Sequence, residues 1–472
     1  MLLASVPKIE LAVVDQLALI AVLVAAVGFG IFTRRQSRGA FEFFSAGRQL
    51  TLPYFVASLV TTWYGGVLGI GESVSYYGLG TWLLLGVPYY VFAAWYAVTF
   101  AGRVRDATAV SIPERIRDRF GPVSGRVAGA LIFALAVPAA HVLMLGVLVQ
   151  LLAAVPLAAG CLLALVVGGL LVMQHGLLAD VRFGLIAFVL MYTGFGVMVA
   201  KNLGVLNQFG TLEPNLRSWT GAQQPLAILS FFILGAWTLV DPGFHQRVAS
   251  ARDTVTSVRG VWIAVGCWLV FDVLTISTGL IALISLRDRP SDPLAIFPAL
   301  AQQSLPPGLR GVFLAGLVAT LLSALVGYLL AAGSAFARDV RGVYAEDESP
   351  NAIRVGMVLA GIAAFALAMA VQSVVSLWYG WAGAVVGALL IPAGLAYLRP
   401  TATRSDHRTA LGMGLAFCAA AAWLIYGVRT NNPLLEVEWL GQRFSLGTLA
   451  PGFLISGIVL GWRGRRPTGT NG

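Results

Sequence analysis

The sequence consists mainly of long apolar segments separated by short polar loops that carry glycine, proline or charge. Most of these segments approach the roughly 20 residues that an α-helix needs to cross a bilayer. We therefore predict an all-α polytopic membrane protein. The pattern predicts about thirteen spans, at 11–32, 53–76, 80–102, 124–153, 157–174, 181–203, 226–245, 258–285, 309–336, 353–371, 374–397, 409–428 and 445–462.

Composition agrees with a membrane protein, since 58% of the 472 residues are hydrophobic and only 11% are charged. A soluble domain carries about 25% charged residues. The net charge of +10 does not indicate a nucleic-acid partner, because the basic residues lie in short loops between apolar segments. The three cysteines, Cys161, Cys267 and Cys418, lie in separate apolar segments and indicate neither a disulfide framework nor a metal site.

The basic residues also predict the orientation in the cell (inner) membrane. With thirteen spans and the N-terminus outside, most of the 31 basic residues fall on the cytoplasmic side, Arg247 among them. The C-terminus is then cytoplasmic. On this topology Arg38 is cytoplasmic and Arg287 is external.

One stretch at membrane depth, residues 57–80, does not read as a continuous helix. Its sequence, ASLVTTWYGGVLGIGESVSYYGLG, places β-branched and aromatic residues directly before two glycines, which weaken helical structure. Irregular backbone within a bilayer must be buried in protein or line a cavity, and broken helices form the binding sites of many transporters. Close helix packing through small residues is the alternative. The residues of this break that we predict to bind substrate are Thr62, Trp63, Tyr64, Gly65 and Gly66.

Other polar residues at membrane depth are further candidates. Asp272 lies in WLVFDVLTISTGL with no basic residue within a turn, and an intramembrane acid is a functional candidate by default. We predict that Asp272 carries a proton; bonding to Thr275 or to a neighbouring helix is the alternative. Glu72 follows the glycine pair by two turns and either gates or binds substrate or lies in an outer vestibule. His141 and Trp237 complete the predicted substrate residues, although a buried histidine is commonly a helix contact.

Catalysis has no support in the sequence. HExxH, GxSxG and paired-carboxylate motifs are absent, as is a nucleotide-binding motif. We predict that the chain is not an enzyme. Its partners are expected to be a small-molecule solute and the lipid bilayer, with no nucleic acid and no cofactor other than a possible Na+.

Several segments resemble the sodium:solute symporter family. The segment FEFFSAGRQLTLPYFVASLVTTWYGG is similar to the family's signature, in which F-x-x-A-G-R-x-L leads into S-L-x-A-T-W. Further similarities, spread between residues 41 and 397, are SYYGLG, SIPERIRDRFG, DPGFHQRVASARD and LPPGLRGVFLAGLVATLLSALVGYLLAAGSAFARDV.

This resemblance implies a LeuT-type fold in a single transporter domain over residues 1–472. Two inverted five-helix repeats would occupy 53–203 and 226–397. One extra helix, 11–32, would precede them, and two would follow within 409–462. Core helices 1 and 6 would be broken, and Asp241-Pro242-Gly243 fits the second break.

The resemblance also implies a sodium site between core helices 1 and 8. Its ligands would be the carbonyls of Thr61, Tyr64 and Thr320, the Ser323 hydroxyl and a hydroxyl at position 324, where this chain has Ala324. Ser323 could instead bond back to its own helix.

Two further family features are missing from the aligned positions. The aspartate that many members carry in core helix 5 aligns with Phe183 and Gly184, and the hydroxyls of a second sodium site align with Val326 and Gly327. Sodium coupling is therefore in doubt, although three carbonyls, one serine and water could hold a weak site.

These observations predict a secondary active transporter, symporter-like, that moves a small polar organic solute by alternating access. The alternatives are a proton-coupled or uncoupled transporter that uses Asp272, and a non-transporting substrate sensor of the same fold.

Overall fold

The computed structural model describes residues 8–33, 39–344, 350–398, 405–430, 432, 436–439 and 442–461. Within them, ten helices are long and apolar enough to cross a membrane, and three shorter apolar helices occupy the places of three other predicted spans. The all-α membrane class is confirmed, while the count of thirteen spans stays a prediction. Arg38 lies outside the described residues, so the predicted orientation rests on the charge pattern alone.

The first half of the chain begins with one helix outside the predicted repeats, α1 (Val13–Thr33), and a short connecting helix, α2 (Ala40–Ser45). The predicted first repeat follows as α3 (Leu52–Trp63), α4 (Val67–Tyr77), α5 (Val87–Tyr96), α6 (Gly102–Asp106), α7 (Ile112–Phe120), α8 (Pro122–Ala136), α9 (Ala139–Ala153) and α10 (Leu157–Asn202). Helix α10 joins two predicted spans across a kink at Gly176, where φ is 63°. A β-carbon there would fall 2.3 Å from the Phe43 carbonyl oxygen, so both the backbone angle and the close approach favour glycine.

The second half contains the predicted second repeat and two further helices. Its elements are α11 (Pro214–Arg217), α12 (Pro225–Leu234), α13 (Pro242–Ser250), α14 (Thr254–Ser285), α15 (Ile296–Ser304), α16 (Leu309–Ser334), α17 (Asn351–Ala370), α18 (Val374–Ser376), α19 (Gly383–Leu398), α20 (Asp406–Arg429) and α21 (Leu449–Gly461). A two-stranded antiparallel hairpin, β1 (Glu436–Trp439) and β2 (Gln442–Ser445), connects α20 to α21 and pairs Glu436 with Ser445.

Short segments of tighter or wider helix interrupt the long helices. The 3₁₀ segments are Ala46–Arg48, Tyr64–Gly66, Gly78–Gly80, Leu203–Thr211, Gly235–Leu239 and Pro293–Ala295, and the π segments are Trp82–Gly86, Ala97–Ala101, Ala335–Val340 and Leu377–Ala382. Two of the 3₁₀ segments, Tyr64–Gly66 and Gly235–Leu239, lie in the predicted core helices 1 and 6.

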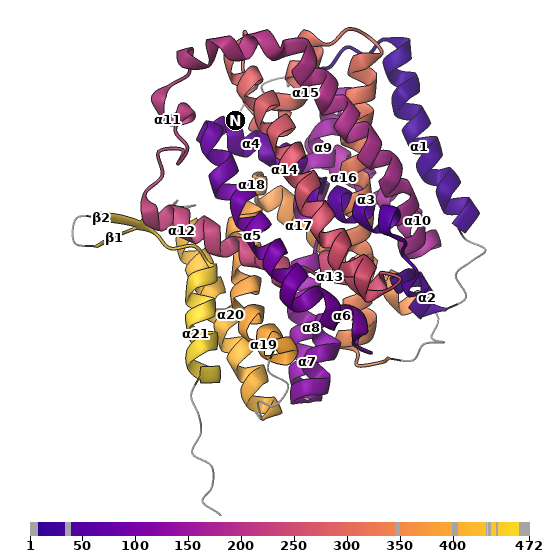
Figure 1. Ribbon diagram of the computed structural model, residues 1–472, viewed down its shortest axis with the longest axis vertical. Helices are drawn as coiled ribbons and strands as arrows, with labels where there is room; N and C mark the ends of the chain where they lie inside the picture. Colours follow the sequence, from indigo (N-terminus) through magenta and orange to yellow (C-terminus); the bar gives the residue numbers. More distant parts are fainter. Residues whose placement is uncertain are drawn as a thin grey trace, which may run out of the picture.

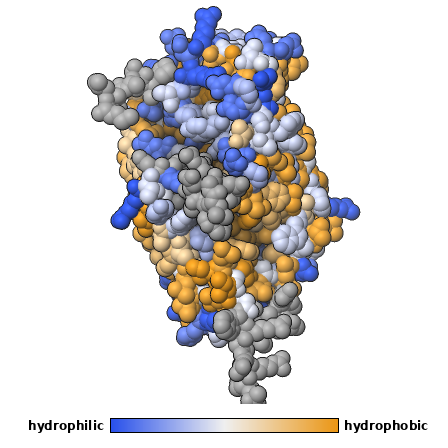
Figure 2. Space-filling model, turned by 90° about the vertical axis from the view of Figure 1, so that its left-hand side faces the viewer, coloured by the Kyte–Doolittle hydropathy of each residue, from blue (hydrophilic) through white to orange (hydrophobic). Residues whose placement is uncertain are grey.

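The helices run between two ends of the molecule, which we name the α15 end and the α7 end after the elements found there (Figure 1). Helix α1 lies on the flank opposite α19, α20 and α21 (Figure 1). Hydrophobic residues cover much of the flank in Figure 2, and hydrophilic residues gather at its upper end. Outward-facing residues such as Val98 (73% exposed) are apolar because lipid is their solvent.

An ion pair fastens α1 to the start of α16. Asp15 accepts hydrogen bonds from the backbone N–H groups of Gly308 and Gly311, both at 2.8 Å, and from the Arg310 guanidinium at 2.6 Å. A carboxylate suits this position because the first N–H groups of a helix have no partner within the helix. Asp253 similarly caps α14, and its hydrogen bond from the Thr256 backbone lowers the pKa of Asp253 to about 2.

Candidate substrate cavity and cation site

The predicted break at Gly65-Gly66 is present, as a 3₁₀ turn between α3 and α4. A β-carbon on Gly65 would fall 2.0 Å from the Ala324 methyl group, and one on Gly66 would fall 2.5 Å from the Trp378 ring. Glycine is therefore required at both positions so that α16 and Trp378 can approach the backbone. Glycine packing and a broken helix, the two interpretations of this stretch, coexist.

The second break lies between α12 and α13, where the sequence Asp-Pro-Gly predicts it. Helix α12 ends in a 3₁₀ segment, and Asp241 then caps α13 by accepting the Phe244 backbone N–H at 2.6 Å. Its other carboxylate oxygen accepts the Tyr328 hydroxyl from α16 at 2.8 Å. The acid therefore restarts the helix and ties it to α16.

A cavity of about 980 Å³, including its opening, is lined by residues of both breaks. Of the predicted site residues, Thr62, Trp63, Tyr64, His141, Trp237 and Asp272 line it, as does Gly66. Further aromatic residues form much of the remaining wall: Tyr89, Tyr90, Tyr328, Trp378 and Trp381. These rings come from three separate elements, α5, α16 and the π segment Leu377–Ala382, so only the packing of those elements brings them together.

Two predicted substrate residues, Gly65 and Glu72, are not among the cavity-lining residues. Gly65 is covered by Ala324 and His141. The Glu72 carboxylate accepts hydrogen bonds from the Ser373 hydroxyl at 2.6 Å and from the Val374 N–H at 2.9 Å. Glu72 therefore caps the start of α18, where free N–H groups favour an acid, and joins α4 to α18.

Asp272 lies in α14 with one carboxylate oxygen toward each of two tyrosines. Its Oδ1 accepts the Tyr64 hydroxyl at 2.7 Å, and its Oδ2 accepts the Tyr90 hydroxyl. Thr275, the alternative partner within the helix, donates instead to the Phe271 carbonyl at 3.0 Å. The acid is thus held by neighbouring helices and borders the cavity.

The Tyr64 hydroxyl has two acceptors and a single proton. It lies 2.7 Å from Asp272 Oδ1 and 2.8 Å from the Trp268 carbonyl oxygen. When Asp272 is ionised, Tyr64 can donate to the carboxylate. When Asp272 is protonated, the acid can donate to the Tyr64 oxygen while Tyr64 donates to Trp268.

Three cavity residues carry buried polar atoms with no hydrogen-bond partner in the described part of the chain. They are Thr62 Oγ1, His141 Nδ1 and Trp237 Nε1. The His141 ring stacks on Tyr328, with ring centroids 4.9 Å apart. Buried polar groups in native proteins usually have partners, so these three atoms are exceptional, and each is itself almost without exposed area.

Of the predicted sodium ligands, Thr61 lies in α3, Tyr64 begins the 3₁₀ segment after it, and Thr320 lies in α16, which packs against both. The side-chain hydroxyls of Thr61 and Thr320 donate to carbonyls one turn earlier in their own helices, those of Ala57 (3.0 Å) and Gly316 (2.8 Å). The resemblance assigns only the carbonyl oxygens of these residues to the ion.

Ser323 is not bonded back to its own helix. Its hydroxyl donates to Asp180 Oδ1 on α10 at 2.8 Å. Asp180 also forms a 2.6 Å ion pair with Arg247 on α13, and both of these charged side chains are fully buried. The neighbouring Ala324 packs on Gly65, so the position of the missing hydroxyl is a methyl contact.

A buried acid, Asp180, lies one turn before the aligned positions Phe183 and Gly184, and it contacts Ser323. The sequence analysis did not select Asp180, because this residue falls between the predicted spans 157–174 and 181–203 and two residues before Arg182. Arg247, grouped with the basic residues of the cytoplasmic side, has a buried side chain.

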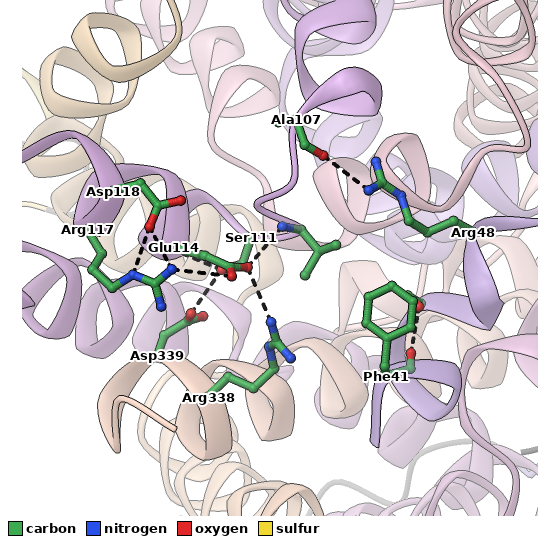
Figure 3. Close-up of polar contacts among 11 residues, drawn as sticks. Phe41, Arg48, Ala107, Ser111, Glu114, Arg117, Asp118, Arg338 and Asp339 are labelled. Atoms are coloured by element: carbon green, nitrogen blue, oxygen red, sulfur yellow. Dashed lines mark hydrogen bonds and ion pairs between the residues drawn. The ribbon is translucent and has the colours of Figure 1, made fainter. Parts of the chain in front are cut away.

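Parts of the segments that carry the family resemblance meet at the α7 end, and Figure 3 shows residues of three of them. Glu114 accepts the Val110 backbone N–H at 3.0 Å and lies 3.3 Å from the Arg338 guanidinium, while Ser111 donates to Asp339 at 2.9 Å. These contacts join the loop before α7 to the end of the α16 segment. They explain the motif SIPERIRDRFG as a structural connection whose residues are not among those that line the cavity.

Arg48, from the signature segment, belongs to the same end of the molecule (Figure 3). Its guanidinium donates to the carbonyl oxygens of Ala107 at 3.1 Å and Ala249 at 3.0 Å. Burial lowers the pKa of Arg48. The residue fastens the segment before α3 to the segments after α6 and within α13.

Comparisons with known proteins agree with this architecture. Residues 43–393 match the model of the sodium:solute symporter family. A Na+-coupled sialic acid symporter in its substrate-bound, outward-open state superposes with a TM-score of 0.75 at 14% identity, over 95% of this chain and 97% of that one. The manganese transporter of Eremococcus coleocola gives a TM-score of 0.55 at 14% identity, over 87% and 92%.

At these identities the two structures establish the transporter fold alone. No curated protein matches the sequence significantly. Within the described residues, no cluster of three or more His, Cys, Asp or Glu side chains is arranged to hold a metal ion.

Proposed function

This chain belongs to the sodium:solute symporter family, and from that premise we propose that it carries a small polar organic solute by alternating access through the cavity between its two broken helices. Family members are transporters rather than enzymes. The cavity lies where such transporters bind substrate, at the interruptions of their core helices. Its wall combines aromatic rings with a few polar side chains, as the sites of small organic molecules commonly do.

The cavity wall supports a solute with both a polar group and a flat or apolar face. Trp63, Trp378 and Trp381 provide ring surfaces for the apolar face. Thr62, His141 and Trp237 also line the cavity, and their unpartnered atoms would bind the polar group once a small side-chain movement exposes them. We expect solutes that combine the two features to bind more tightly than purely aliphatic or fully polar ones.

We further propose that Asp272 couples transport to protons. The observation that carries this proposal is the pair of acceptors around the Tyr64 hydroxyl, Asp272 at 2.7 Å and Trp268 at 2.8 Å. This arrangement gives the Tyr64 and Asp272 side chains a hydrogen bond to each other whether Asp272 is charged or neutral. An acid that binds and releases a proton on alternate sides of the membrane needs both states to be tolerated.

Reconstitution into proteoliposomes tests the proposal. A panel of solutes would be offered, with the sodium gradient and the pH gradient varied independently. We expect one class of ring-containing polar solute to accumulate only when a pH gradient is imposed. Accumulation that follows sodium alone would contradict the coupling, and saturable binding without any transport would support the sensor alternative.

A further inference from the structure

The cavity between the two broken helices is lined by aromatic rings and a single acid. Eight of its 21 lining residues are tryptophan or tyrosine, and Asp272 is the one with an acidic side chain. Among the lining residues that the structure describes, none is lysine or arginine. A solute in this cavity therefore faces ring surfaces and one carboxylate, and it meets no fixed positive charge.

His141 of α9 is the remaining lining residue that can become a cation. Its Nδ1 is buried without a hydrogen-bond partner in the described part of the chain, and its ring stacks on Tyr328. An imidazolium ion would leave an N–H group at Nδ1 without an acceptor, whereas a neutral imidazole can keep its single proton on the other nitrogen. The geometry therefore favours an uncharged histidine, and an anionic solute would find no cation in the wall.

The segment before α5 is shaped to hold Asp272 at the cavity. Gly86 ends the π segment Trp82–Gly86, and a β-carbon there would fall 2.8 Å from Asp272 Oδ2 and 3.1 Å from the Tyr90 hydroxyl. A side chain at position 86 would therefore push the acid and its tyrosine apart. Glycine, which itself lines the cavity, keeps the carboxylate in the wall.

Hydrogen bonds to acids make three of the rings better partners for a cation. Tyr64 and Tyr90 donate their hydroxyl protons to Asp272. Tyr328 donates to Asp241 at 2.8 Å. Donation to a carboxylate polarises a phenol and leaves more negative charge on its ring, and the negative face of a ring is what attracts a cation.

We propose that the solute of this cavity is a small organic cation, an ammonium or pyridinium-type ion that lies among the rings with its charge toward Asp272. This inference rests on the proposed function, because it takes the cavity as the solute site, and it names the class of solute. Rings attract a cation most strongly where water is excluded. The cation also supplies the positive charge that the tyrosine hydroxyls do not give to the buried carboxylate.

A cation and a proton would then neutralise Asp272 in turn, since the carboxylate carries a single negative charge. The titratable groups that face Asp272 from neighbouring elements are the tyrosines Tyr64, Tyr90 and Tyr192, and His141 borders the same cavity. A proton on Asp272 removes its attraction for the cation. We therefore expect cation binding to weaken on acidification, and each cation carried in one direction to be exchanged for one proton carried in the other.

Isothermal titration calorimetry of the purified full-length protein in detergent tests the class of solute. Three probes share one ring framework and differ in charge: 3-(hydroxymethyl)-1-methylpyridinium, 3-methylbenzyl alcohol and 3-methylbenzoate. Titrations into detergent micelles alone are subtracted. We expect wild type to bind the pyridinium about tenfold or more tighter than the alcohol, and to bind the benzoate most weakly. Tetramethylammonium, a smaller cation, should compete with the pyridinium.

Two positions separate the charge from the rings. Asp272→Asn should bind the pyridinium about tenfold more weakly, through the rings alone, and should lose the dependence of binding on pH. Trp378→Leu should weaken pyridinium binding more than alcohol binding, and Trp378→Phe, which keeps a ring, should restore most of it. Trp262→Leu is the matched control, because Trp262 is 47% exposed and is not among the residues that line the cavity.

Three results would overturn the inference. They are tighter binding of the alcohol or the benzoate than of the pyridinium, no saturable binding of either cation to wild type, and a preference for the cation that Asp272→Asn leaves unchanged. If Asp272→Asn does not fold, wild type still decides, since equal pyridinium binding at acidic and neutral pH would contradict the role of Asp272. Failure of the transport proposal is recognised separately. Cation binding without any transport would contradict transport alone, and accumulation of a neutral or anionic solute would contradict the solute class alone.

Discussion

Two aspartates buried among the membrane helices, Asp272 and Asp180, have opposite surroundings. Asp272 borders the cavity, and its described side-chain partners are the neutral hydroxyls of Tyr64 and Tyr90. Asp180 is fully buried, and its partners are the Arg247 guanidinium and the Ser323 hydroxyl. One aspartate thus lies beside a cavity and has no cation partner, while the other lies in a closed junction and is paired with an arginine.

The difference separates a group that can change charge from one that holds structure together. Burying a carboxylate is costly unless a cation compensates its charge or a proton neutralises it. For Asp180 the compensation is part of the chain, so the proton has no role there. For Asp272 neither hydroxyl compensates the charge, so a proton or a bound solute must do so. The predictions below test this distinction.

The largest expected effect is on stability, from Asp180→Ala. The substitution leaves the Arg247 guanidinium buried and unpaired, which should lower the free energy of unfolding by roughly 3–5 kcal/mol. Thermal unfolding in detergent measures it. The double variant Asp180→Leu/Arg247→Met, which removes both charges, is the control and should recover much of the loss. Equal destabilisation by the single and double variants would show that the unpaired charge does not cause the loss of stability.

Asp272→Asn should have its effect on coupling rather than on folding. We expect gradient-driven accumulation in proteoliposomes to fall to the equilibrium level, while exchange of labelled for unlabelled solute continues. The asparagine keeps the shape of the side chain but cannot carry a proton. Glu72→Gln is the matched control, because Glu72 caps α18 outside the cavity lining, and it should still accumulate solute. Should Asp272→Asn accumulate solute like wild type with the same pH dependence, Asp272 has no part in coupling.

Tyr64→Phe and Tyr90→Phe should weaken coupling without removing it. Each deletes one hydroxyl bonded to Asp272, and a hydrogen bond to a charged group is worth about 1.5–3 kcal/mol, so we expect proton-driven uptake to slow by roughly tenfold or more. Tyr192→Phe is the control. The Tyr192 hydroxyl also donates to α14, the helix of Asp272, but its acceptor is the Cys267 carbonyl at 2.6 Å. Initial uptake rates at a fixed pH gradient distinguish the three variants. Equal rates for all three variants would mean that the hydroxyls do not support Asp272.

The smallest effect is expected at the first sodium position. The first position lacks the hydroxyl at 324, where the Ala324 methyl group packs on Gly65, so uptake should be the same in sodium and in choline for wild type, Ser323→Ala and Ala324→Ser. The measurement is the initial rate under a constant pH gradient. Ala324→Ser adds the hydroxyl that the family pattern expects, so a sodium dependence that appears in this variant and is lost in Ser323→Ala would show that the first site remains functional.

Much of the architecture followed from local properties of the chain. Apolar segment length predicted the membrane class, and the glycine pair at 65–66 and Asp241-Pro242-Gly243 predicted the two breaks, since glycine and proline act on the backbone of their own turn. Asp272 was also identifiable, because an acid in an apolar run is rare enough to notice. The same argument did not identify Asp180, because this residue falls between the predicted spans 157–174 and 181–203 and two residues before Arg182.

The partners of these groups were decided only by the tertiary structure. Tyr90 lies 182 residues from Asp272 in the chain, Arg247 lies 67 from Asp180, and Ser373 lies 301 from Glu72. In a membrane protein both the buried and the lipid-facing sides of a helix are apolar, so hydropathy does not tell which way a helix is turned. The sequence by itself therefore determined the class, the breaks and the presence of buried acids. The rotation and packing of the helices decided that one acid faces a cavity, one caps a helix and one is neutralised by an arginine.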